Sequence, residues 1–273
     1  MSLKEKVMIV NLSISQWTAR KHDKKITREV EQSHNAKDSG RFNKILIATE
    51  ALKNIQKVAG QARTFHYFNT LPWGDNGDRI LSSKNYFNYV GEMSKIKTEF
   101  NSCVQDFISQ YPTYKEDARI RLNGMFDEAD YPSVGLIKEK FSIAFSFMPI
   151  PDAEDMRIQI QEEEVTKIRQ EVQLQLDFRV DNSINEILKR CRSVVSHMSE
   201  KLLDPEAVFR DSLVTNISTL IDVIPLLNFN DDGHVKEVVR MLKPLCVDPE
   251  DLRQDTVFRR EVGLRAANIL NKI

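Results

Sequence analysis

The sequence predicts a mainly α protein, with long helices that include an αα-hairpin and with a small two-stranded antiparallel sheet. Only nine glycines and nine prolines interrupt the 273 residues, and this composition favours helices with short connections. Apolar residues recur every three to four positions along three long segments, which is the period of a helix. Two shorter segments, residues 6–16 and 141–147, carry the β-branched or alternating residues that are typical of strands.

These two strands are expected to pair with each other although they lie far apart in the chain. The second strand alternates large apolar residues with smaller ones, the large ones being Phe141, Ile143, Phe145 and Phe147. Because two strands alone are marginally stable in water, helices should cover this apolar face.

Helices should fill most of the chain between the two strands. A short helix containing Ile26 and Val30 is expected first, followed by a polar loop over residues 33–40. A long helix over residues 41–69 comes next, and its small residues at positions 59–62 would let another helix approach closely.

A turn should join this helix to a second long one. Residues 71–78 (LPWGDNGD) are the strongest turn signal in the chain. The second helix is expected from Ser82 or Ser83 to Tyr111, where Pro112 should end it. A capping box at residues 113–116 would then start a shorter helix to Phe126.

The longest predicted helix runs from Asp155 to Asp204. At about 1.5 Å per residue it would be roughly 65 Å long, whereas a compact sphere of this chain length is nearer 50 Å across. The protein is therefore expected to be elongated or oligomeric, or else this helix breaks. Its apolar stripe consists of Val165, Ile168, Val172, Leu176, Val180, Ile184, Ile187, Cys191, Val194, Met198 and Leu202.

An alternative remains open for residues 171–180. Apolar and polar residues alternate strictly over Val172–Val180, which is a strand pattern. A new helix would then start through a capping box formed by Ser183 and Glu186.

Beyond this helix, the triplets Asp204-Pro205-Glu206 and Asp248-Pro249-Glu250 repeat one signal for a helix start. Pro225 should kink or end the first of these helices, a short helix should span Gly233–Leu242, and the last should reach the C-terminus. We expect residues 1–151 to form a strand, helical-hairpin and strand unit and residues 152–273 to form a helical unit, with one continuous domain as the alternative.

No residue set predicts catalysis, a metal site or a cofactor. The sequence has no phosphate-binding loop, dinucleotide fingerprint or paired histidines. The segment 228–239 imitates a calcium loop, but Val239 stands where the bidentate acid is required. The acids at 127–130 are interpreted as a solvated helix end. The pair His22-Asp23 lacks a neighbouring nucleophile.

Cysteine spacing and hydropathy also predict the cellular compartment of the protein. Cys103, Cys191 and Cys246 lie far apart, which predicts a reducing compartment and no disulfide framework. Neither a signal peptide nor a run of about 20 apolar residues is present. The sequence thus predicts a cytoplasmic protein without a membrane partner.

The strongest candidate site is a basic cluster next to a tryptophan. Residues 1–66 hold 13 Lys or Arg and 6 Asp or Glu, a net charge of +7, so the remainder carries −8. Cations beside an aromatic ring suit phosphate contacts and base stacking on a single strand. The alternative is a solvated loop and helix face. The cluster consists of Trp17, Arg20, Lys21, Lys24, Lys25 and Arg28.

A second candidate surface surrounds Trp73 and Arg79. Here the alternative is that Trp73 closes the end of the helical hairpin from inside.

The order of a strand ending in residues 16–20 (QWTAR), a helix entering the turn 71–77 (LPWGDNG) and a Tyr/Phe-rich helix resembles an uncharacterised family of phage and bacterial proteins. The resemblance covers the layout of residues 6–150. Members are often encoded near MoxR-type AAA+ ATPases, so it implies a phage setting and an AAA+ or nucleic-acid context. It assigns no site residues.

The expected function is therefore a non-catalytic interaction or assembly protein, phage-encoded and self-associating. A host or phage protein would be its partner, and the host cytoplasm its location. The alternative is a single-stranded nucleic-acid-binding protein that uses the basic N-terminal region, with an enzyme as a third reading.

Overall fold

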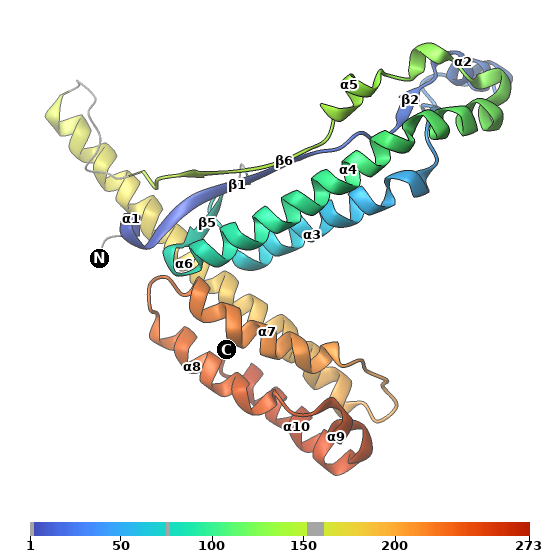
Figure 1. Ribbon diagram of the computed structural model, residues 1–273. Coiled ribbons are helices and arrows are strands. Elements are labelled where there is room, and N and C mark those ends of the chain that lie inside the picture. The colour runs from blue at the N-terminus through green and yellow to red at the C-terminus, as the bar shows by residue number, and fades with distance from the viewer. Residues whose placement is uncertain (1–2, 75–76, 152–160) are drawn as a thin grey trace. The chain divides into compact units, whose positions relative to one another are not determined.

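The computed structural model describes residues 3–74, 77–151 and 161–273, and it is mainly helical, as predicted (Figure 1). The chain divides into two compact units. Unit 1 contains Met1–Asn11, Tyr67–Val90 and Ser146–Ile273, and unit 2 contains Leu12–His66 and Gly91–Phe145. The expected division at residue 151 does not coincide with these units, because each is assembled from separated segments.

The elements with regular geometry are mostly helices. In chain order they are α1 (Leu3–Lys6), β1 (Val7–Ser15), β2 (Arg20–His22), α2 (Lys24–Ser33), β3 (Asn43–Ile45), α3 (Lys53–Asn69), β4 (Leu71–Pro72), β5 (Arg79–Ser82), α4 (Tyr86–Leu122), α5 (Val134–Lys138), β6 (Ser142–Met148), α6 (Glu162–Leu203), α7 (Ser212–Leu227), α8 (Gly233–Leu242), α9 (Pro249–Gln254) and α10 (Thr256–Leu270).

The predicted pairing of the two long strands is confirmed, since β1 and β6 are neighbours in the sheet. The sheet is larger than predicted, with four strands in the order β4-β5-β1-β6. The turn segment supplies the extra strands: β4 and β5 form a hairpin in which Leu71 faces Ile80, and Val7 of β1 faces Ser82 of β5. A separate two-stranded sheet joins β2 to β3.

The apolar face of β6 is covered only in part. Ile143 is buried, whereas Phe145 and Phe147 are half-buried. The rings of Tyr86 and Tyr89 lie 5.4 and 6.3 Å from that of Phe147. The first turn of α4 thus contributes part of the expected cover.

The helix predicted over residues 41–69 is wrong in its first part. Asn43–Ile45 form β3, a 3-10 turn spans Thr49–Leu52, and α3 begins at Lys53. The competing bonds are non-local, because β3 pairs with β2 and the Leu46 amide donates to the Ala19 carbonyl at 2.8 Å.

The small residues of α3 lie in the interior of unit 2. Ala59 and Ala62 are fully buried there. The close approach that they permit is therefore used inside the chain.

The expected helix end at Pro112 and the capping box at residues 113–116 are also wrong, because α4 continues through Pro112 to Leu122. Proline removes one backbone hydrogen bond. Tertiary contacts hold the extension: Ala118 is buried, and Lys115 and Arg119 form ion pairs with Glu128.

The predicted αα-hairpin consists of α3 and α4, which run alongside each other in Figure 1. At its closed end, the Asn85 side-chain amide donates to Asn69 Oδ1 at 3.0 Å.

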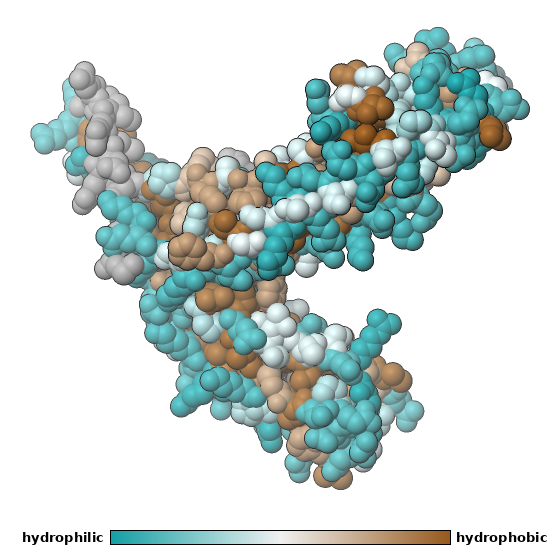
Figure 2. All heavy atoms as spheres, in the orientation of Figure 1, coloured by the Kyte–Doolittle hydropathy of each residue, from teal (hydrophilic) through white to brown (hydrophobic). Residues whose placement is uncertain are grey.

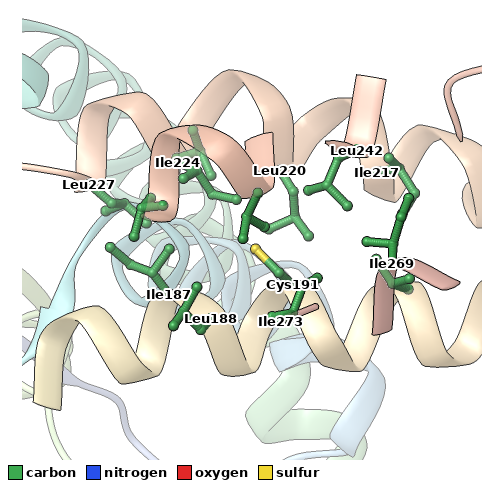
Figure 3. Close-up of a cluster of buried hydrophobic side chains, with 14 of the residues drawn as sticks. Ile187, Leu188, Cys191, Ile217, Leu220, Ile224, Leu227, Leu242, Ile269 and Ile273 are labelled. Carbon is green, nitrogen blue, oxygen red and sulfur yellow. The ribbon is translucent and has the colours of Figure 1, made fainter. Parts of the chain in front are cut away.

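Residues 162–203 form the single helix α6, so the strand alternative for residues 171–180 is wrong. The predicted residues 155–160 lie outside the described part of the chain. From Ile187 to Leu202 the apolar stripe is buried against α7, α8 and α10, which together form the core of unit 1 (Figure 3). Cys191 is a free thiol in this core, Cys103 is half-buried and Cys246 is exposed.

The expected helix start at Asp204 is wrong, since Asp204 follows the last residue of α6 and α7 begins at Ser212. The Asp204 carboxylate does accept a bond from the Glu206 amide at 3.0 Å. However, Arg259 donates to the carbonyls of Lys201, Asp204 and Ala207, which fixes a turn there.

The later helix signals agree better with the structure. Pro225 lies two residues before the end of α7, and α8 spans the predicted Gly233–Leu242. The Asp248 cap starts α9 as predicted. That helix then stops, because Asp255 caps a new helix, α10.

Candidate ligand-binding site

Unit 2 contains an open cavity of about 370 Å³ beside Trp17 and Arg20, and we call it the unit 2 cavity. Its apolar wall consists of Trp17, Ile47 and Leu52, with the half-exposed Ile45 at one side. Its volume falls in the range of roughly 300–1,000 Å³ that small-molecule sites occupy.

The polar wall of the unit 2 cavity carries positive charge, and the described residues that form it include no acid. It is formed by Gln16, Thr18, Thr49, Gln56, Arg20 and Arg63. Gln56 and Arg63 lie seven residues apart on α3, and two helical turns place them on one side of the helix. The wall therefore offers two guanidinium groups and two side-chain amides to a ligand.

The link between β1 and β2 presents Trp17 and Arg20 through an unusual backbone conformation. Ala19 has a φ of 49°, in the left-handed region that residues with a Cβ rarely adopt. It is fully buried, and its carbonyl is held by the Leu46 amide. A strained residue that its surroundings fix in place is a common feature of binding loops.

Aromatic neighbours hold the Trp17 ring in position. The rings of Phe107 and Tyr111 on α4 meet it edge-on, with centroids 6.3 and 6.0 Å away. Trp17 is half-buried and lines the cavity with the remainder of its surface. The indole is thus a fixed wall of the cavity.

The predicted basic cluster is divided by the structure. Arg20 lines the unit 2 cavity, whereas Lys24, Lys25 and Arg28 are exposed on α2. Within the described residues, these four cations form no ion pair with a carboxylate. Hydrophilic side chains dominate the surface around α2 in Figure 2.

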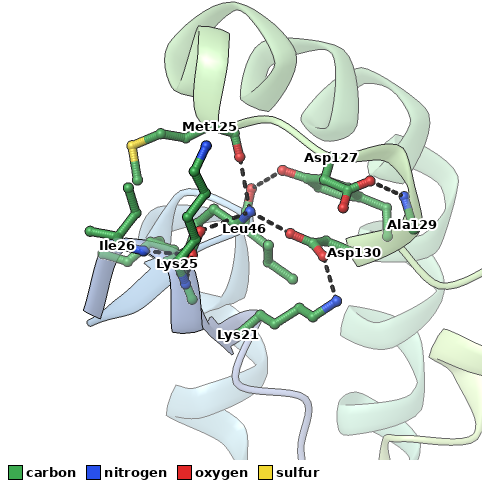
Figure 4. Close-up of polar contacts among 12 residues, drawn as sticks. Lys21, Lys25, Ile26, Leu46, Met125, Asp127, Ala129 and Asp130 are labelled. Carbon is green, nitrogen blue, oxygen red and sulfur yellow. Dashed lines mark hydrogen bonds and ion pairs between the residues drawn. The ribbon is translucent and has the colours of Figure 1, made fainter. Parts of the chain in front are cut away.

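Lys21 differs from the rest of the cluster, because its ammonium lies 2.5 Å from the buried Asp130 carboxylate (Figure 4). Lys44 pairs with the same carboxylate at 2.5 Å and with Asp23 at 3.5 Å, and it donates to the Met125 carbonyl at 2.9 Å. Burial alone would raise the pKa of Asp130, but the bonds from the two lysines outweigh burial and lower it.

This ion-pair network corrects the interpretation of Asp130 and shows how Asp23 is used. Asp130 is no solvated helix end, since only 4% of its side chain is exposed. Asp23 caps α2 by accepting bonds from the Lys25 and Ile26 amides, and His22 lies 3.1 Å from the Thr27 hydroxyl. The pair His22-Asp23 therefore has a structural role.

The second candidate surface is interior instead. Trp73 is only 4% exposed and belongs to the core of unit 1, so it closes the hairpin end from inside. The Arg179 guanidinium lies over its ring at 5.4 Å. Arg79 donates to Thr70 and to the Tyr67 carbonyl, and burial, together with the nearby Arg190, lowers its pKa to about 10.

Sequence reasoning missed Gln16 and Gln56 as members of the Trp17 site, and it considered Arg63 only as a cation that could share a face with residues 20–28. The seven-residue spacing between Gln56 and Arg63 on α3 was the signal available for Gln56. Nothing local connects residues 56 and 63 with residues 16–20, since they meet only through the fold of unit 2.

Over residues 3–74, 77–151 and 161–273, no helix is both long and apolar enough to cross a membrane. The same residues bring no three His, Cys, Asp or Glu side chains together in a way that could hold a metal ion. Comparisons with models of protein families, with curated proteins and with solved structures find no match for this chain.

Proposed function

We propose that this chain is a non-catalytic assembly protein that self-associates through the first half of α6. The observation that carries the proposal is a change along one helix. From Ile187 to Leu202 most of the apolar stripe of α6 is buried, whereas from Val165 to Val180 the stripe is only half-buried. Leu176 and Val180 still pack at the edge of the unit 1 core, but Val165, Ile168 and Val172 are not part of it among the described residues.

This segment is apolar on two sides. Val165, Ile168 and Val172 continue the stripe, while Leu174 and Phe178 point to the opposite side and are 70% and 66% exposed. A helix that carries an apolar stripe normally buries that stripe against another element. The first half of α6 therefore fits a contact with another helix.

Charge favours a second copy as the occupant. Arg169 and Asp177 lie eight residues apart, and each follows a residue of the stripe by one position, so both lie on the same side of it. In an antiparallel pair centred on Gln173, each arginine would face the aspartate of the other copy. Such complementarity specifies partner and register more than it adds affinity. The phage setting, the host cytoplasm and an AAA+ partner remain part of this proposal on the resemblance alone.

The test of self-association is the mass in solution. By light scattering at micromolar concentration, the wild type should exceed the monomer mass of 31.6 kDa. Replacing both Ile168 and Val172 by Asp should return it to that mass, because charges would enter the apolar contact along the stripe. Val257→Asp, at an exposed apolar position of α10, is the matched control and should keep the assembly. A wild-type mass of 31.6 kDa throughout would contradict the proposal.

Single-stranded nucleic-acid binding is a second candidate, supported by the unpaired cations of α2. Each phosphate contact should lower log affinity by roughly 0.7 per tenfold increase in salt. Replacing Lys24, Lys25 and Arg28 together by Ala should therefore flatten the salt dependence by about two. Lys95→Ala, which removes a cation already paired with Glu92, is the control. No binding of a strand of about 30 nucleotides near 50 mM salt would remove this candidate.

A further inference from the structure

We propose that the unit 2 cavity is a nucleoside phosphate site, in which the base lies against the Trp17 wall and the phosphate meets Arg20 and Arg63. The inference is independent of self-association. It deepens the nucleic-acid candidate if the ligand is one unit of a strand, and it stands without that candidate if the ligand is a free nucleotide.

The wall composition favours a flat, partly polar ring as one part of the ligand. Trp17 gives most of the exposed apolar surface, because Ile47 and Leu52 are only 1% and 3% exposed, and the edge contacts of Phe107 and Tyr111 fix the indole before a ligand arrives. A base can lie against such a surface whatever its identity, because every base has an aromatic face. Side-chain amides both donate and accept hydrogen bonds, so Gln16 and Gln56 match the mixed edge of a base.

The charge of the walls favours a phosphate as the other part. Arg20 and Arg63 are exposed, line the same cavity and have no carboxylate partner among the described residues. None of the described residues that line the cavity is an acid, so an anion meets no repulsion from these walls. The planar guanidinium group matches two phosphate oxygens at once, which makes arginine well suited to this contact.

The backbone conformation also indicates that the cavity is a formed binding site. The left-handed Ala19 stands between the side chains of Thr18 and Arg20, which both line the cavity. The Leu46 amide holds its carbonyl, and the next residue, Ile47, belongs to the apolar wall. This bond, next to the pairing of Arg20 with Ile45 in β2 and β3, ties the Thr18–Arg20 segment to the segment that carries Ile47.

Calorimetry on the full chain tests the site with adenosine and uridine 5′-monophosphate, each compared with its nucleoside. We expect both nucleotides to bind, and the nucleosides to bind more weakly because they lack the phosphate. Arg20→Ala and Arg63→Ala should each weaken nucleotide binding by roughly ten- to a hundred-fold, the usual value of a hydrogen bond to a charged group. Lys57→Ala removes an exposed cation of α3 outside the cavity wall and should change nothing.

A strand of about 30 nucleotides distinguishes the two sources of the ligand. If Arg63→Ala weakens strand binding as it weakens nucleotide binding, the site takes one unit of a strand. If the nucleotides bind and the strand does not, the ligand is a free nucleotide and the nucleic-acid candidate fails alone. The inference is overturned if neither nucleotide binds, or if binding is unaffected by both arginine substitutions in variants whose thermal unfolding matches the wild type. Strand binding through α2 could survive that result.

Discussion

Lys44→Met is expected to lower the free energy of unfolding by about 3–5 kcal/mol, the usual cost of removing one partner from a buried ion pair. The Lys44 side chain is 7% exposed, and its ammonium satisfies Asp130, Asp23 and the Met125 carbonyl together. Methionine keeps most of the volume of the side chain but removes the charge. Asp130 would then remain buried with Lys21 alone, and that lysine is half exposed.

Urea denaturation of the variant and the wild type measures this difference. Lys53→Met is the matched control, since Lys53 pairs with Glu50 on the surface and such pairs contribute about 1 kcal/mol or less. A loss from Lys44→Met that does not exceed the loss from Lys53→Met would contradict the role assigned to the network.

The same network predicts how the free energy of unfolding changes at acid pH. The pKa of Asp130 is lower in the folded protein than in the unfolded chain. Its contribution is therefore fully present above the unfolded value of about 3.9 and is lost as the pH falls through the folded value. Burial alone would lower the pKa of Lys44, but Asp130 and Asp23 raise it, so its contribution is lost only at high pH. Lys44→Met should flatten the fall of stability at acid pH.

The sequence predicted the elements whose own pattern is long or repeated. The stripe of α6 was readable because eleven apolar residues keep one period, and β1 and β6 were readable because their residues alternate or branch at Cβ. Local signals failed where distant groups compete. Asp204 forms the bond expected of a cap, yet Arg259 from α10 fixes the chain beyond it in a turn.

The same distinction applies to the candidate site. Trp17 and Arg20 could be chosen because they are neighbours in sequence, and both line the unit 2 cavity. The ion pair between Lys21 and Asp130 could not be predicted, since 109 residues separate the two. Arg63 completes the site from α3, and only the folded chain brings it there.

Ile217→Ala is expected to cost about 2–5 kcal/mol in the free energy of unfolding, the range for truncating a buried isoleucine. Ile217 lies on α7 and is fully buried in the core of unit 1, near Ile269 in Figure 3. The loss combines the apolar surface no longer removed from water with the cavity that the packed helices cannot close.

Two further variants grade that effect in the same denaturation experiment. Ile217→Val removes a single methylene and should cost only about 0.5–1.5 kcal/mol. Val257→Ala, at an exposed position of α10, should stay within about 0.5 kcal/mol of the wild type. If Ile217→Ala were as stable as Ile217→Val, the core of unit 1 would have to be packed differently. The expected order follows because the penalty grows with the volume removed from a close-packed interior, whereas an exposed side chain leaves no cavity behind.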